Sequence, residues 1–240
     1  MNNFRSSLFI VGNLLIFFSF YLVIPFIVDL SNNGTDWRVF ISIAAFCFFI
    51  GFNISFVFKN KKKDVGIGSA FFLTLICWIV LTIIGALPFY LGSLNLTFID
   101  SFFESMSGMT TTGATVLTNL DETPKSILIW RAMLQWLGGI GIIVMAITLM
   151  PIMNVGGMQL FKISNNDSTE KILPKSKEIA LRLIYIYVAL TTLCLICYKF
   201  LGMNIFDSLT HSMTTLSTGG FSNYNQSIGF FCSLWVLIHI

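Results

Sequence analysis

The chain repeats one stretch, Asp100-Ser-Phe-Phe-Glu-Ser-Met-Ser-Gly-Met-Thr-Thr-Thr-Gly-Ala-Thr115, 107 positions later as Asp207-Ser-Leu-Thr-His-Ser-Met-Thr-Thr-Leu-Ser-Thr-Gly-Gly-Phe-Ser222. The positions that are identical without a gap are Asp100, Ser101, Ser105, Met106, Thr111 and Gly113, which correspond to Asp207, Ser208, Ser212, Met213, Thr218 and Gly220. Each copy lies in a polar break between two long apolar segments. One copy alone would fit a polar surface loop, whereas two copies in register predict a repeated structural element.

Both copies predict a short helix followed by an irregular turn. Thr97-x-x-Asp100 and Asn204-x-x-Asp207 each place an N-cap side chain three residues before an acid, which favours a helix start. We expect the helices to end near Met109 and Leu216. If both enter the membrane from its outer face, the negative ends of their dipoles point at the membrane centre and favour a cation there. The Thr, Ser and Gly residues that follow can offer backbone carbonyls in place of an ion's hydration shell.

Long uncharged segments predict membrane spans. The chain is 55% hydrophobic and 10% charged, and segments 8–28, 39–58 and 71–91 contain no Asp, Glu, Lys or Arg. Segments 127–150 and 180–198 are charged only near one end. At a rise of ~1.5 Å per residue, each segment can cross a hydrocarbon core of about 30 Å. Segment 8–28 is too long for a signal peptide and lacks an Ala-x-Ala-like cleavage site, so we expect it to remain as a span.

The spans and the repeat divide the chain into four parts. We expect an all-α membrane protein with an N-terminal two-span hairpin (1–66), a complete span–pore helix–filter–span unit (67–154), a cytoplasmic linker (155–174) and a second such unit (175–240). The last apolar run starts near Ser233 and stops at Ile240, so we expect the inner span of the second unit to be truncated.

The distribution of Lys and Arg predicts the orientation. Basic loops stay on the cytoplasmic side, and the basic residues cluster before the first span, in segment 59–63 and in segment 162–182. We therefore expect a cytoplasmic N-terminus and cytoplasmic loops at 59–66 and 151–178, with both pore elements entering from outside. The net charge of +3 is then a topology signal and requires no nucleic-acid partner.

Three stretches resemble the TrkH-type potassium uptake proteins of the superfamily of K+ transporters. They are Phe102-Phe-Glu-Ser-Met-Ser-Gly-Met-Thr-Thr-Thr-Gly-Ala-Thr115, His211-Ser-Met-Thr-Thr-Leu-Ser-Thr-Gly-Gly-Phe-Ser222 and Leu149-Met-Pro-Ile-Met-Asn-Val-Gly-Gly-Met-Gln-Leu-Phe161. The resemblance covers essentially the whole chain, and the N-terminal hairpin favours the TrkH branch over the KtrB branch. It implies a K+-translocating subunit of the bacterial inner membrane, with no enzymatic activity and no cofactor besides the transported K+.

The resemblance also implies site residues and partners. The family filter maps to Thr111, Thr112 and Gly113 and to Thr218, Gly219 and Gly220, with Thr110 and Ser217 flanking them. Family members contact membrane lipid, pair as homodimers and bind a cytosolic nucleotide-binding regulatory subunit (TrkA-like). They carry four pore units, whereas this sequence holds one complete unit and most of a second. The alternative is therefore a non-conducting truncated remnant or fragment of such a transporter.

Several other residues have two interpretations. Glu104 either stands behind the filter as a structural residue or lines an outer vestibule, and Asp100 and Asp207 complete helix caps. We expect a structural role for Arg131 near the outer end of its span, where it can reach the interface or a vestibule acid. Gly138, Gly139 and Gly141 indicate close helix packing. Cys194-x-x-Cys197, His211 and His239 lack companions for a zinc or redox site. An intramembrane enzyme would need a cluster of acid–base or nucleophilic groups, which the spans do not supply.

Overall fold

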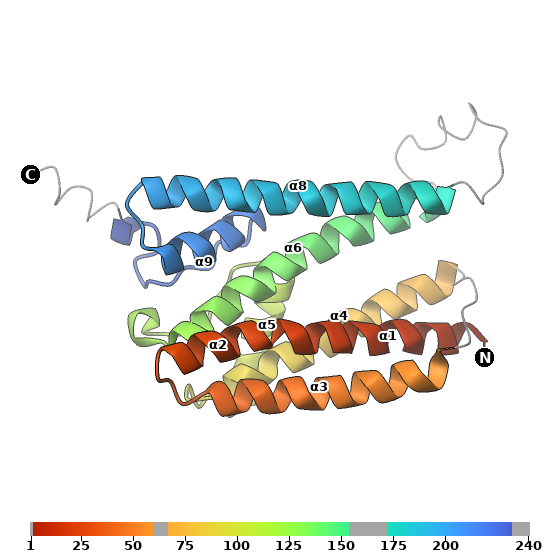
Figure 1. The fold of residues 1–240 in the computed structure, drawn as a ribbon, viewed down its shortest axis with the longest axis horizontal. Helices are drawn as coiled ribbons and strands as arrows, with labels where there is room; N and C mark the ends of the chain where they lie inside the picture. Colours follow the sequence, from red (N-terminus) through yellow and green to blue (C-terminus); the bar gives the residue numbers. More distant parts are fainter. Residues whose placement is uncertain (1, 60–66, 154–171, 232–240) are drawn as a thin grey trace, which may run out of the picture.

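The computed structural model describes residues 2–59, 67–153 and 172–231 (Figure 1). Every regular element in these ranges is helical, which confirms the predicted all-α class. The elements are α1 (Asn2–Tyr21), α2 (Val23–Ser31), α3 (Trp37–Phe58), α4 (Ile67–Leu91), α5 (Phe98–Met109), η1 (Leu120–Glu122), α6 (Lys125–Met153), α8 (Ile172–Phe200) and α9 (Ile205–Leu216). Residues 155–171 of the expected cytoplasmic linker and the final apolar run from Ser233 lie outside the described residues, whereas the last three linker residues, 172–174, belong to α8.

Five helical segments are long and apolar enough to cross a membrane. They are Ser7–Ser31, Trp37–Phe58, Phe71–Leu91, Lys125–Met145 and Glu178–Phe200. Figure 1 shows them side by side, with α1, α4 and α8 running one way and α3 and α6 running back. By contrast, α5 and α9 have 12 residues each and reach only about 18 Å, too short to span about 30 Å of hydrocarbon. Both lie toward the end of the bundle where α6 begins (Figure 1).

The first span, predicted over 8–28, lies within the segment Ser7–Ser31 and contains one break. It consists of α1 and α2, separated at Leu22. Pro25 explains the break, because proline has no backbone N–H and its ring crowds the carbonyl of the residue four positions earlier. The amide of Leu22 still donates to the Phe18 carbonyl, so the two helices continue as one span.

The N-terminal hairpin is packed tightly and is anchored to α6. A side chain at Gly12 would lie 2.9 Å from the Ser55 nitrogen, so α1 and α3 approach backbone to backbone at this point. The buried Trp130 of α6 meets the ring of Phe18 edge-on at 5.5 Å between centroids. Its Nε1 donates to the Gly85 carbonyl of α4 at 3.0 Å. This indole therefore joins the hairpin, α4 and α6 in one core.

Buried carboxylates fix the connecting turns of the hairpin. Asp29 accepts from the Trp37 amide at 2.7 Å and from Ser126 Oγ at 2.6 Å, which ties the turn after α2 to the start of α6. Asp36 accepts from the amide and the hydroxyl of Ser93, just after α4. Buried acids are stable when their oxygens receive hydrogen bonds, as here. The end of the bundle that carries α5 and α9 is thereby held in place.

Candidate functional site

The short helices α5 and α9 begin in the same way. Thr97 Oγ1 accepts from the Asp100 amide at 3.2 Å, and Asn204 Oδ1 accepts from the Asp207 amide at 2.8 Å. The side chains of Asp100 and Asp207 accept in turn from the two N-cap side chains. The predicted caps are confirmed, and α5 and α9 end at Met109 and Leu216, as expected from the sequence.

The two helices also end in the same way. At the end of α5, the Thr111 amide donates to the Gly108 carbonyl and the Thr112 amide to the Ser107 carbonyl, each at 3.0 Å. At the end of α9, the amides of residues 218 and 219 donate to the carbonyls of Thr215 and Thr214, again at 3.0 Å. This pair of bonds is the Schellman motif. We call the segments that follow loop 1 (residues 110–116) and loop 2 (residues 217–224).

Both loops adopt positive φ angles at matching positions. Loop 1 has φ of 57° at Thr111 and 78° at Gly113, and loop 2 has 56° at Thr218 and 75° at Gly220. Glycine adopts such angles readily, whereas threonine does not. A left-handed conformation costs a non-glycine residue about 1–2 kcal/mol, so the fold holds two threonines in a conformation they disfavour. Strained backbone of this kind clusters at functional sites.

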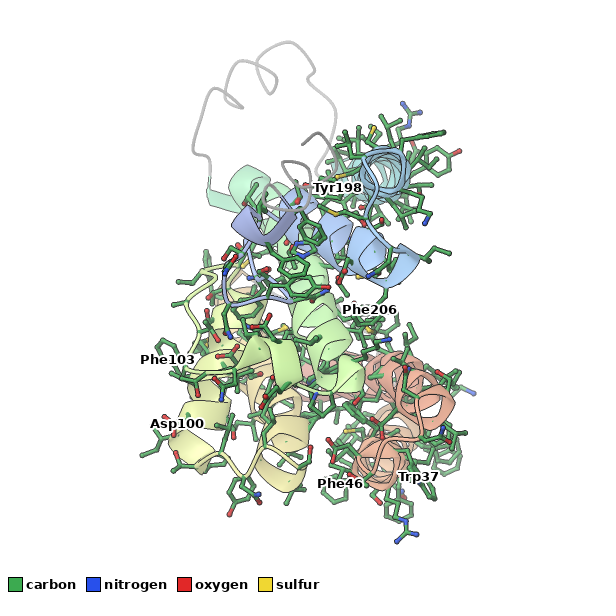
Figure 2. All side chains as sticks on the ribbon, turned by 90° about the vertical axis from the view of Figure 1, so that its left-hand side faces the viewer. Trp37, Phe46, Asp100, Phe103, Tyr198 and Phe206 are labelled. Atoms are coloured by element: carbon green, nitrogen blue, oxygen red, sulfur yellow. The ribbon has the colours of Figure 1, made fainter. Side chains whose placement is uncertain are left out.

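The loops meet each other and rest on α6. A side chain at Gly113 would overlap the carbonyl oxygen of Gly219, so the two loops touch through backbone. On α6, a side chain at Gly138 would overlap the Met109 carbonyl, and one at Gly139 would lie 3.0 Å from Ser217 Cβ. The predicted close packing is confirmed for these two glycines. Gly141 differs, because its added Cβ would lie 3.9 Å from Trp78, an ordinary contact. Figure 2 shows α6 between α5 and α9.

A buried ion pair joins the two loops. Arg131 Nε donates to Glu104 Oε1 at 2.7 Å, and both side chains are at most 1% exposed. Arg131 Nη2 donates to Thr115 Oγ1 in loop 1, and its Nη1 donates to the Ser222 carbonyl in loop 2, both at 3.0 Å. Thr115 and Ser222 occupy equivalent positions of the repeat.

Glu104 completes this cluster from behind loop 1. Its Oε2 accepts from the Val116 amide at 2.9 Å, and both carboxylate oxygens accept from Thr115 Oγ1. The burial of Glu104 supports the structural interpretation and contradicts a place in an open vestibule. Arg131 does not reach the membrane interface, since it is buried beside Glu104 and its guanidinium carbon lies 4.2 Å from the centroid of the Phe221 ring.

Loop 2 is held by a different acid. Asp207 is buried and accepts from Asn223 Nδ2 at 2.7 Å and from the Tyr224 hydroxyl at 2.8 Å. Burial, together with this hydrogen bond and the charge of Asp207, raises the pKa of Tyr224 to about 12. Asn223 occupies the position of Val116 in the repeat. A carboxylate therefore binds each loop at equivalent positions, Val116 and Asn223. The two carboxylates, Glu104 and Asp207, come from different turns of their helices.

His211 replaces Glu104 in the second copy. It is buried, and its ring meets Phe231 edge-on at 5.6 Å between centroids. Burial lowers the pKa of His211, although the charge of Asp207 opposes this shift. The second copy therefore places a neutral ring where the first copy places an anion.

Sequence reasoning missed Gln135, a fully buried residue of α6 one helical turn after Arg131. Its Oε1 accepts from the Phe221 amide of loop 2 at 3.1 Å. The i, i+4 spacing of Arg131 and Gln135 on an apolar helix is a sequence signal for a shared polar face. That signal does not reveal what this face contacts.

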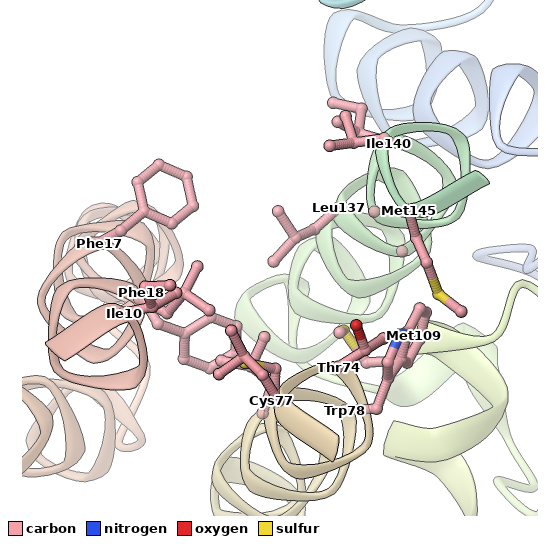
Figure 3. A pocket seen from close by; sticks show the side chains of 16 residues that line it. Ile10, Phe17, Phe18, Thr74, Cys77, Trp78, Met109, Leu137, Ile140 and Met145 are labelled. Carbon is pink, nitrogen blue, oxygen red and sulfur yellow. The ribbon is translucent and has the colours of Figure 1, made fainter. Parts of the chain in front are cut away.

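A separate cavity of about 350 Å³ lies between α1, α4 and α6, beside Met109 (Figure 3). It is lined by Ile10, Leu14, Phe17, Phe18, Leu73, Thr74, Cys77, Trp78, Leu81, Met109, Leu137, Gly138, Ile140, Gly141, Val144 and Met145. The lining is mainly apolar and contains no carboxylate. Within residues 2–59, 67–153 and 172–231, no group of His, Cys, Asp and Glu side chains could hold a metal ion.

Comparison with known proteins places these features in a family. Residues 37–240 match the TrkH family, described as cation transport proteins. The Trk system potassium uptake protein TrkH of Escherichia coli K12 is 42% identical over 234 residues, which cover 96% of this chain and 48% of that protein. TrkH of Halomonas elongata is 38% identical over 98% of this chain and 51% of its own length, and TrkG of Escherichia coli K12 is 33% identical over 92% and 46%.

A solved structure shows the same fold. The crystal structure of the potassium transporter TrkH from Vibrio parahaemolyticus superposes with a TM-score of 0.78 at 35% identity, covering 98% of this chain and 49% of that one. The chain thus spans about half the length of the relatives that it matches.

Proposed function

We propose that this chain, which belongs to the TrkH family of cation transport proteins, forms part of the K+ pathway of a Trk-type uptake system in the bacterial inner membrane. The observation that carries the proposal is the matched backbone of the two loops. Each follows a short capped helix, and each has positive φ at residues separated by one position. Two such segments in contact supply convergent peptide carbonyls of the kind that replace an ion's hydration shell.

The ion-binding groups are then Thr111, Thr112 and Gly113 in loop 1 and Thr218, Gly219 and Gly220 in loop 2, with Thr110 and Ser217 beside them. Their role is to present oxygen atoms, so no chemistry occurs on the transported ion and no cofactor takes part. The C-terminal ends of α5 and α9 precede the loops directly, and the negative ends of both helix dipoles favour a cation there.

The orientation and the partners belong to the same proposal. The N-terminus faces the cytoplasm, because the described basic residue Lys59 lies at the end of the hairpin nearest the N-terminus, within the basic segment 59–63. The protein pairs as a homodimer within the lipid and binds a cytosolic nucleotide-binding regulatory subunit. These two partners rest on the family resemblance. The alternative remains a non-conducting fragment, and transport measurements distinguish the two.

Two glycine variants test the role of the loops. Gly113→Ala introduces both strain, at φ of 78°, and overlap with the Gly219 carbonyl. Gly220→Ala introduces strain alone, since nothing lies within 4 Å of its added Cβ. Gly202→Ala is the matched control, because Gly202 has φ of 94° and an equally open surrounding but lies between α8 and α9.

The assay is K+-dependent growth of an uptake-deficient bacterial host together with 86Rb+ and 22Na+ uptake, with the complete gene product that contains residues 1–240. We expect Gly113→Ala to reduce the preference for Rb+ over Na+ more than Gly220→Ala, and Gly202→Ala to leave it unchanged. Equal preference for Rb+ over Na+ in all three variants would show that the two loops do not line the ion path. Absence of uptake by the unsubstituted protein would favour the non-conducting alternative.

A further inference from the structure

Gln135 occupies the junction between the two loops. The residue lies on α6 and is fully buried, and its Oε1 accepts from the Phe221 amide of loop 2. Since the Phe221 amide is a donor, the oxygen of the side-chain amide faces loop 2, and this bond fixes which end is Nε2. Among the residues that the structure describes, Nε2 has no hydrogen-bond partner.

Two glycines let this amide lie directly on the loop backbone. A Cβ added to Gly219 would lie 2.6 Å from both Nε2 and Oε1 of Gln135. A Cβ added to Gly113 would lie 3.7 Å from Nε2. These are the same two glycines through which the loops touch, where the Gly219 carbonyl approaches Gly113. The side-chain amide therefore lies against the contact between the loops.

A buried N–H group without an acceptor raises the free energy of the folded protein. The place where the fold keeps such a group therefore indicates a role for it. An apolar side chain of similar length would fill the space without leaving a donor unpaired. The acceptors characteristic of this junction are backbone carbonyls, and a carbonyl oxygen has two lone pairs.

We infer that Gln135 is a positioning residue that sets the spacing between loop 1 and loop 2. Its Oε1 holds loop 2 through the Phe221 amide, and its Nε2, which has no acceptor among the described residues, lies against the Gly113–Gly219 contact. The inference rests on the proposed function, because spacing matters to transport only if the loops line the ion path. Gln135 itself touches no ion. Its effect is on ion preference, through the carbonyls whose separation it controls.

The test uses the complete gene product that contains residues 1–240, purified and reconstituted in liposomes. Gln135→Met removes both amide groups at similar length, whereas Gln135→Glu keeps an acceptor for Phe221 but loses the Nε2 donor. Ser126→Ala is the matched control. Ser126 lies on α6, as Gln135 does, but its buried 2.6 Å bond goes to Asp29 of α2, away from the loops. Two quantities are measured: the Rb+ to Na+ uptake ratio and hydrogen exchange of the Phe221 amide.

We expect Gln135→Met to lower the uptake ratio about tenfold and to speed Phe221 exchange about tenfold, the effect of losing one buried hydrogen bond. Gln135→Glu should lower the ratio while protecting the Phe221 amide. Ser126→Ala should change neither quantity, although it lowers the unfolding temperature. If Gln135→Met does not fold, Gln135→Asn gives the same comparison, because its amide is one methylene too short to keep both the Phe221 bond and the place of Nε2 against the loop contact.

A wild-type uptake ratio in Gln135→Met would overturn the inference, as would unchanged Phe221 exchange. Uptake by the unsubstituted protein distinguishes failure of this inference from failure of the proposed function. If the unsubstituted protein carries no Rb+, the transport proposal fails, and the exchange measurement alone decides whether Gln135 holds loop 2. Faster exchange in Gln135→Met, with Ser126→Ala unchanged, then supports the positioning role.

Discussion

Removing one partner of the Glu104–Arg131 pair should destabilise the protein strongly. Arg131→Met deletes the 2.7 Å bond to Glu104 and the two 3.0 Å bonds to Thr115 and Ser222. Glu104 then stays fully buried with donors only from Thr115 and Val116. Leaving one charge of a buried pair uncompensated costs about 3–5 kcal/mol. Solvent screening does not reduce this figure, since neither side chain is exposed by more than 1%.

A double-mutant cycle separates the pair from general damage to the core. Glu104→Gln alone leaves the guanidinium buried, whereas Glu104→Gln with Arg131→Met leaves no charge in the cluster. We expect the double variant to lose less stability than the sum of the single variants, by about 1–3 kcal/mol. Denaturant unfolding in detergent, followed by tryptophan fluorescence, measures these differences.

Arg38→Met supplies the control for loss of an arginine. Arg38 is exposed and lies 5.2 Å from the centroid of the Trp37 ring, so its replacement should cost less than about 1 kcal/mol. The reasoning is refuted if Arg131→Met costs no more than Arg38→Met. It is also refuted if the two single losses add to the double loss within about 0.5 kcal/mol.

Two further predictions concern the second pore element. Asp207→Asn should lower the free energy of unfolding more than Asp100→Asn, measured by the same denaturant titration. Asp207 is buried and holds Asn223 and Tyr224, whereas the bonds of Asp100 to described residues lie within its own cap, so equal losses would contradict the anchoring role. Burial lowers the pKa of His211 in the folded protein, so the unfolded chain takes up a proton first as the pH falls below about 6.5. Acidification from pH 7.5 to 5.5 should therefore lower the unfolding temperature, and His211→Phe should weaken this dependence; an unchanged pH profile in the variant would exclude His211 as its source.

The helix ends of the pore elements could be predicted because their signals are local. Thr97 and Asn204 lie three residues from the acids that complete their caps, and the glycines lie just beyond the helix ends. The left-handed threonines at 111 and 218 escaped prediction, since sequence rules favour glycine at that position of a Schellman motif. The paired hydrogen bonds at both helix ends place this position in the left-handed conformation even though it is threonine.

Contacts between distant residues could not be predicted in detail. Arg131 was expected to have a structural role and Glu104 had two interpretations, but nothing in their spacing identified them as partners across 27 positions. Gln135 was passed over because its partner, Phe221, is 86 positions away. Such pairs depend on how α6 lies between α5 and α9, and that arrangement results from packing over the whole bundle (Figure 2).

The differences between the two copies follow from their shared use of α6. Arg131 and Gln135 both bind loop 2, although α6 belongs to the first span–pore helix–filter–span unit (67–154). The position that corresponds to Arg131 in the second copy is Ile238, and the position of Glu104 is occupied by His211, so the charged pair is encoded once. A second buried ion pair would repeat the desolvation cost without joining the same two loops. Loop 2 is instead held from its own helix by Asp207 and from its neighbour by Arg131 and Gln135. The geometry of the second loop is therefore set partly by the first unit, so substitutions on α6 should affect both loops together.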